Sequence, residues 1–181
     1  MGDVTQVLTG SGGIVSVAPL NTALPTSTAA ALNAAFADVG LVSEDGVSIN
    51  ATADYLEIKS WDGSTVRKPR TSFDPTVSFV MLETNQESLE LYWSGSTVQA
   101  NTGESKIEIV PFATDRRSFV IDVNDGTRVT RYVLPVAEVT ERQEIAHRPD
   151  QPVAYGVTLT AYPDGDGTAI YEYIDEDLTA S

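Results

Sequence analysis

Cysteine is absent from this 181-residue chain, and histidine occurs only once. Without thiols there can be no disulfide, thiolate metal site or cysteine nucleophile. The single imidazole, His147, excludes metal sites built from several histidines, and no motif places a serine beside it as a catalytic triad would require. We predict that His147 is an exposed loop residue.

Positive charge is also scarce. The chain has 11 Lys and Arg against 26 Asp and Glu, a net charge of −15. Because phosphate binding rests on Lys and Arg, this balance argues against a protein that wraps nucleic acid. Solubility is the simplest reason for the charge, and a surface that avoids adhesion to another polyanion is the alternative.

Long apolar runs and a targeting segment are missing as well. No stretch approaches the ~18 apolar residues of a membrane span. The N-terminus has neither a basic start nor an apolar core of the signal-peptide kind. We expect synthesis in a cytoplasm and no membrane span.

Apolar residues make up 41% of the chain, enough for one sizeable core. Residues 1–27 are rich in Gly, Thr, Ser and Pro and predict an N-terminal arm or extension with a short strand near Ile14–Ala18. Residues 28–181 then form a single domain.

Two segments favour helices. The first, 27–40, is rich in alanine, with a cap at Ser27 or Thr28 and an end at Gly40. The second, 84–95, begins with a capping box that we assign to Thr84 and Glu87.

The rest of the chain has a period of two, typical of strands. The hairpin signals are Asp62-Gly63 and the segment 124–126 (Asn-Asp-Gly), and a Gly-containing loop is expected over 96–104. Strands are expected over 54–61, 65–71, 76–83, 105–112, 137–145, 152–162 and 168–175, and a hairpin over 118–135. We predict a mainly β fold, an antiparallel sandwich or barrel with a flanking α-helix.

No motif for catalysis, cofactor or metal emerges. The segment 164–168 (DGDGT) resembles part of a calcium loop, but Ala169 stands where the loop needs glycine, so we expect a β-turn. The many carboxylates single out no glycosidase-type pair, and Gly10–Gly13 lacks the Lys-Ser/Thr ending of a phosphate loop. We predict that the protein is not an enzyme.

Four of the 11 basic residues, with one tryptophan, gather in KSWDGSTVRKPR, residues 59–70. A solvated hairpin is the simple interpretation, but Trp and Arg are typical interface anchors. The partner could be another copy, with acids from Glu44 and Asp45 or from the C-terminus. The candidate interface residues are Lys59, Trp61, Arg67, Lys68, Arg70, Glu172, Asp175, Glu176 and Asp177.

Several segments, in this order, resemble the major tail (tail tube) proteins of long-tailed bacteriophages, particularly those that infect actinobacteria. They are FADVGLVSEDGVSI, LEIKSWDGSTVRKPRT, SFVMLETNQESLELYW and VNDGTRVTRYVLPVAEVTERQEI, between about Phe36 and Leu159. The resemblance implies a structural virion protein related in fold to the type VI secretion tube protein.

The resemblance further implies self-assembly into hexameric rings that stack into a tail tube, the conduit for genome delivery. The implied partners are the tape-measure, tail-tip and tail-terminator proteins, with DNA passing through the lumen without specific binding. Assembly is expected in the host cytoplasm. The alternative is a non-catalytic β-sandwich binding module for carbohydrate or virion decoration, with Trp61, Tyr162 and Tyr171 as a sugar platform.

Overall fold

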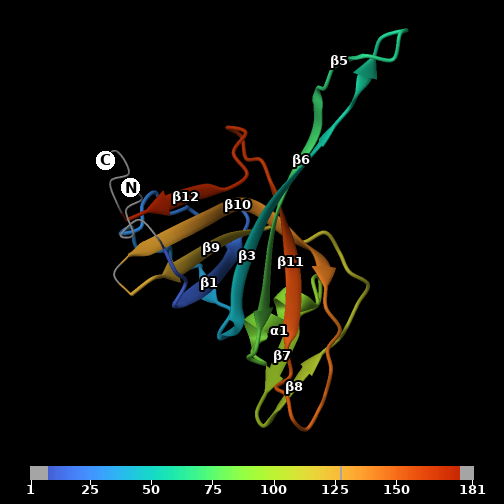
Figure 1. Cartoon of the computed structure of the whole chain (residues 1–181). Helices are drawn as coiled ribbons and strands as arrows, with labels where there is room; N and C mark the ends of the chain where they lie inside the picture. The colour runs from blue at the N-terminus through green and yellow to red at the C-terminus, as the bar shows by residue number, and fades with distance from the viewer. Residues whose placement is uncertain (1–7, 127, 176–181) are drawn as a thin grey trace.

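A computed structural model describes residues 8–126 and 128–175 (Figure 1). Within them the fold is mainly β and antiparallel with one helix, which confirms the predicted fold class. The elements are β1 (Gly12–Pro19), β2 (Ala37–Asp38), β3 (Val42–Tyr55), β4 (Ile58–Lys59), β5 (Thr65–Arg67), β6 (Arg70–Met81), α1 (Gln86–Tyr92), β7 (Val98–Asn101), β8 (Glu104–Ile107), β9 (Arg117–Asn124), β10 (Val129–Arg142), β11 (Tyr155–Tyr162) and β12 (Tyr171–Ile174).

The main sheet has the strand order β2-β1-β9-β10-β11-β6-β3, and β12 also pairs with β10. Strand β10 connects the two halves: its first part pairs with β9 and β12, and its last part with β11. The β9–β10 ladder is irregular between Leu134 and Ala137. Around this point β10 bends, and β3, β6 and β11 run across the direction of β1 and β9 (Figure 1). The sheet therefore folds over itself and encloses a core.

Alternating residues of the strands fill that core. In β6, Val77, Phe79 and Met81 are buried, and in β9 the largest buried side chains are Phe119 and Ile121. The burial of each such side chain stabilises the folded state by about 1.5–3 kcal/mol. Because one face of β6 and β11 packs in the core, the opposite face of the same two strands points outward.

Helix α1 covers one end of the core with Leu91 and Tyr92. The helix is confirmed, but its capping box is formed one residue later than predicted. Asn85 accepts a hydrogen bond from the Ser88 amide at 2.8 Å, and the Ser88 hydroxyl accepts one from the Asn85 amide at 3.1 Å. The helix ends before Gly95, whose φ of +88° favours glycine. No helix in the described ranges is long and apolar enough to cross a membrane.

The predicted helix over 27–40 is wrong: this segment consists of turns and the two-residue strand β2. Its carbonyl groups bind a distant side chain. Arg131 donates hydrogen bonds to the carbonyls of Ser27 at 2.9 Å and Ala30 at 2.7 Å. A tertiary contact thus overrides the helix propensity of the alanines.

Two further segments differ from prediction. The expected loop over 96–104 contains β7, which pairs with β8, and the expected strand over 105–112 ends at Ile107. At the N-terminus, β1 pairs with β9 along its whole length and buries Val15 and Val17 in the core. The separation of residues 1–27 from the domain stays a prediction, since residues 1–7 lie outside the described ranges.

Candidate assembly interface

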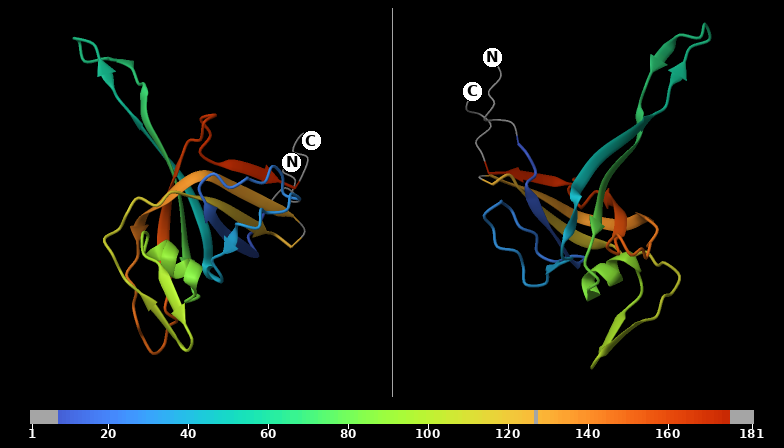
Figure 2. Two further views of the ribbon diagram at one scale, coloured as in Figure 1. Left: turned by 180° about the vertical axis from the view of Figure 1, so that it is seen from behind. Right: turned by 60° about the horizontal axis from the view of Figure 1, so that its bottom comes forward.

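A long hairpin projects from the body of the molecule, and we call its residues 50–75 the arm (Figures 1 and 2). Strands β3 and β6 pair from Val42–Met81 at the body to Tyr55–Arg70 far outside it. Beyond this ladder, β4 and β5 pair and close the hairpin. Residues 56–71, the arm tip, hold all five basic and aromatic residues that the sequence singles out in this region.

The two faces of the arm differ in polarity. One face continues the core-facing side of the sheet, through the cross-strand pairs Ile49–Val77, Ala51–Pro75 and Ala53–Phe73. Val77 is fully buried, but Ile49 is 40% exposed and Phe73 49% exposed, because no element in residues 8–126 and 128–175 covers the sheet there. The other face carries Asn50, Thr52, Asp54, Ser72 and Asp74. An amphipathic strand pair without a covering layer indicates a contact surface.

The tip presents Trp61, whose side chain is fully exposed, on an ordered turn. The Ser60 amide donates to the Ser64 carbonyl at 2.8 Å, and the Gly63 amide to the Ser60 carbonyl at 2.9 Å. Hydrogen bonds from the hydroxyls of Ser60 and Ser64 lower the pKa of Asp62 to about 2. The ordered turn fixes the backbone on which Trp61 is presented before any partner binds, which lowers the entropic cost of binding.

The arm tip differs in charge from the rest of the chain. Its four basic and two acidic residues give +2, while the other residues contain seven basic and 24 acidic ones. Lys59 and Lys68 share Glu57, at 3.9 and 3.6 Å. The Arg70 guanidinium lies over the Phe73 ring at 5.4 Å. Arg67 pairs with Ile58 through the β4–β5 ladder, but its guanidinium forms no ion pair or hydrogen bond within the described residues, so its charge is available to a partner.

The acidic half of the predicted interface lies elsewhere. Glu172 belongs to β12 and Asp175 follows it, on the side of the molecule away from the arm tip (Figures 1 and 2). Burial, together with a hydrogen bond to Glu172, raises the pKa of Tyr132 to about 12. Glu176 and Asp177 lie outside the described residues. The chain does not bring these acids to its own arm tip.

Other candidate sites take on structural roles. The Gly167 amide donates to the Asp164 carbonyl at 3.1 Å, which closes the predicted β-turn. The Asp164 carboxylate accepts hydrogen bonds from the amides of Asp166 and Thr168 and from the Tyr171 hydroxyl at 2.7 Å. No group of three or more acidic or histidine side chains in the described ranges could hold a metal ion. His147 is exposed.

The aromatic residues of a sugar platform do not lie together. Trp61 is on the arm tip, Tyr162 on β11 and Tyr171 on β12. The Arg116 guanidinium covers the Tyr162 ring at 4.6 Å, which removes one face from any stacking ligand. The structure thus offers no specific support for a carbohydrate-binding module.

Sequence analysis did not identify a polar sheet surface on β6, β11 and β10. Here the Ser78 and Thr158 hydroxyls lie 3.1 Å apart and those of Thr140 and Thr160 2.9 Å apart. The Tyr162 hydroxyl donates to Glu138 on the same surface. In the sequence, Ser or Thr alternates with an apolar residue over 76–78 and 158–160. This alternation indicates a polar surface only once the core-facing side of the strands is known.

Comparison with known proteins agrees with these features. A family model described as phage tail tube protein matches residues 1–181. A sequence comparison with curated proteins finds no match.

Among solved structures, the fold is similar to a chain of an extracellular contractile injection system, the PVC sheath–tube complex in the extended state. The TM-score is 0.51 at 14% identity, with 93% of each chain covered. A chain of the PVC sheath/tube terminator in the extended state is similar with a TM-score of 0.50 at 12% identity, covering 94% of this chain and 99% of that one. At these identities the likeness concerns the fold, and the match of the family model over the whole length shows that the chain belongs to the phage tail tube proteins.

Proposed function

We propose that this tail tube protein, a structural protein and not an enzyme, assembles into hexameric rings that stack into the tube through which the genome leaves the virion. The observation that carries the proposal is the arm, which exposes an apolar face and a cationic tip on an otherwise acidic molecule. A monomer gains nothing from such an arm, whereas a second copy can cover its apolar face and pair its charges.

The free edge of β3 supports lateral contacts within a ring. Within the described residues β3 pairs only with β6, so the other edge of this 14-residue strand has unpaired backbone groups. Long open edges favour pairing with a further strand. Edge-to-edge pairing between neighbouring subunits would use these groups and extend the sheet around a ring.

The polar surface of β6, β11 and β10 is suited to a lumen. Strand β11 contains no Lys or Arg, and β6 contains only Arg70 at its outer end. The two arginines of β10 have partners: Arg131 binds Asp122, and Arg142 donates to the Tyr92 carbonyl. Arg116, at the border of the surface, lies 3.9 Å from Glu138. A wall of hydroxyls and carboxylates lets a polyanion pass, because it offers no free cations to hold phosphates.

In this proposal the partners are further copies of the chain, a tape-measure protein inside the tube, and tail-tip and terminator proteins at its ends. DNA passes through without base-specific contacts. The subunits assemble in the host cytoplasm and end up in the virion tail.

Negative-stain electron microscopy of the purified protein, over a concentration and salt series, tests the proposal. Hollow rings or tubes of uniform width are expected. Monomers at all concentrations, also after addition of a tail-tip complex, would contradict it.

Charge reversal at the arm tip tests whether its cations contact another copy, with Glu44, Asp45, Glu172 and Asp175 among the candidate acids. The double variant Arg67→Glu/Lys68→Glu should fold normally, because both side chains are exposed. Each ion pair contributes only ~0–1 kcal/mol, so we expect the concentration needed for assembly to rise on the order of tenfold. Sedimentation velocity measures this concentration.

The matched control for this reversal is Lys106→Glu/Arg148→Glu, which changes the net charge equally at exposed positions away from the arm. The control should assemble like the wild type. Equal assembly of the arm variant and the wild type would show that the tip cations are merely solvated.

Added positive charge on the proposed lumen surface should trap DNA. Thr76 and Thr160 are cross-strand partners, and the variant Thr76→Lys/Thr160→Lys should bind DNA inside assembled tubes at low salt and release it at high salt. Co-sedimentation of tubes with DNA measures the effect. Gln99→Lys/Ser105→Lys, on the exposed β7–β8 hairpin, is the control and should bind less. Equal DNA binding by both variants would place the Thr76 surface outside the lumen.

A further inference from the structure

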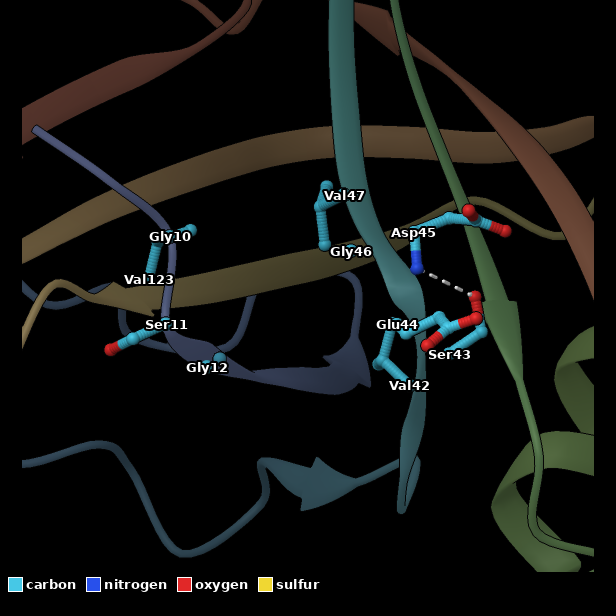
Figure 3. Close-up of a pocket in the computed structure, with 11 residues that line it drawn as sticks. Gly10, Ser11, Gly12, Val42, Ser43, Glu44, Asp45, Gly46, Val47 and Val123 are labelled. Carbon is cyan, nitrogen blue, oxygen red and sulfur yellow. Dashed lines mark hydrogen bonds between the residues drawn. The ribbon is translucent and has the colours of Figure 1, made fainter.

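A groove lies between the start of β1 and the start of β3 (Figure 3). Gly10–Gly13 form one wall, Val42–Val47 the other, and Val123 of β9 contributes as well. The cavity volume is about 450 Å³, within the range of ~300–1,000 Å³ typical of ligand pockets. Its lining is mixed: three glycines on one wall and three valines offer apolar contact, beside the polar residues Ser11, Ser43, Glu44 and Asp45.

The shape of the groove depends on its glycines. A Cβ atom at Gly13 would lie 2.8 Å from the Asp122 carbonyl oxygen, so β1 could not pair as closely with β9. Gly46 has a φ of +68°, which favours glycine, and lies at the irregularity of the β3–β6 ladder between Val42 and Val47. Both walls are thus set by backbone geometry and stay in place without a ligand.

Two acidic residues, Glu44 and Asp45, are among the lining residues on the β3 side, and the Asp45 carboxylate is directed away from the glycine wall (Figure 3). Within the described residues neither forms an ion pair, and the Asp45 amide donates to the Ser43 hydroxyl at 3.3 Å. A groove that combines valine side chains with two acidic residues suits a ligand that combines an apolar group with positive charge.

We propose that this groove receives Trp61 of a second copy of the chain, with Arg67 and Lys68 of that copy facing Glu44 and Asp45. The proposal rests on self-assembly as the proposed function and names the surface that accepts the arm. The arm tip has the required chemistry: a fully exposed indole on an ordered turn, flanked by cations. The guanidinium of one of them, Arg67, has no ion pair within the described residues.

The arm tip cannot fill the groove of its own chain. The groove lies at the first residues of β3, and the tip follows its last residue. At about 3.3 Å per residue, the intervening strand separates them by roughly 40 Å, and the arm points away from the body in both views of Figure 2. Contact must therefore join two copies through unlike surfaces, which closes a ring or continues into a stack.

Cysteine cross-linking tests the contact directly, because the chain has no cysteine of its own. Ser64→Cys marks the arm tip and Ser43→Cys the groove, each in a separate chain. After mixing and mild oxidation, we expect a disulfide-linked dimer on a non-reducing gel. Trp61→Ala in the Ser64→Cys chain should reduce its yield on the order of tenfold, as expected for an interface anchor. The control pair, Ser64→Cys with Ser105→Cys on β8, should give only background.

Charge exchange provides a second measurement. The variant Glu44→Lys/Asp45→Lys, with a wild-type arm tip, should assemble more weakly than the wild type. Assembly should recover when this variant is combined with Arg67→Glu/Lys68→Glu. If Arg67→Glu/Lys68→Glu instead recovers assembly when it is combined with Glu172→Lys/Asp175→Lys, the groove is overturned as the acceptor.

The outcomes separate this inference from the proposed function. Tubes without the Ser43–Ser64 dimer would overturn the groove contact and leave the tube function supported. The dimer without tubes would support the contact and count against the tube function. With neither dimer nor tubes, both would fail.

Discussion

Replacing Arg131 with methionine is expected to lower the free energy of unfolding by about 3 kcal/mol, the range seen when one partner of a buried ion pair is removed. The guanidinium is buried and forms a two-pronged contact with Asp122, at 2.6 Å from Nε and 2.9 Å from Nη2. Its remaining donor, Nη1, binds the carbonyls of Ser27 and Ala30. Methionine fills similar space but leaves a carboxylate and two carbonyls without these donors.

Thermal and urea unfolding of the Arg131→Met variant measure the loss. Hydrogen exchange should also increase in the segment 21–36, because Arg131 holds its backbone against β10. Arg116→Met is the matched control: Arg116 is 48% exposed and lies 3.9 Å from Glu138, so its loss should cost only ~0–1 kcal/mol. Similar losses in both variants would contradict the structural role of Arg131.

The same residue explains the largest error of sequence-based prediction. Local propensity favours a helix over 27–40, and nothing within that segment indicates that its carbonyls bind a guanidinium a hundred residues later. By contrast, the β9–β10 hairpin follows from local signals alone: alternating apolar residues and the Asn124-Asp125-Gly126 turn. Elements stabilised by neighbours in sequence were predictable, whereas those held by distant side chains were not.

The candidate interface was likewise predictable from the sequence only in part. The arm tip was predictable because its Trp, Lys and Arg are close in sequence and flank a turn at Asp62-Gly63. The length of the arm was not, since the polar segment 71–75 gave no sign that β6 begins at Arg70 and pairs with β3 as far as Tyr55. The groove was not predictable either, because Gly10–Gly13 acquire a role only when β1 pairs with β9 and approaches β3.

Removal of the outer arm should abolish tube formation with little effect on folding. The change replaces residues 55–71 with Asn-Gly, a sequence that favours a tight hairpin turn, and joins Asp54 to Ser72. These two residues are already cross-strand partners, and the Ser72 hydroxyl donates to Asp54 at 3.1 Å. The deleted large apolar side chains are exposed in the monomer, so we expect the free energy of unfolding to change by less than about 1 kcal/mol.

Assembly should respond quite differently, because the deletion removes Trp61 and all four arm-tip cations at once. The remaining chain then has seven basic and 24 acidic residues, and subunits of such charge repel one another. Electron microscopy and sedimentation at high protein concentration should therefore detect only monomers or isolated rings, with the Tm preserved. If this variant forms normal tubes, the contacts between stacked rings lie in the body of the protein and not in the arm. A large fall in Tm would show instead that the arm stabilises the monomer, contrary to its exposure. Because the variant separates folding from assembly, it tests whether the arm exists for a neighbouring copy rather than for its own chain.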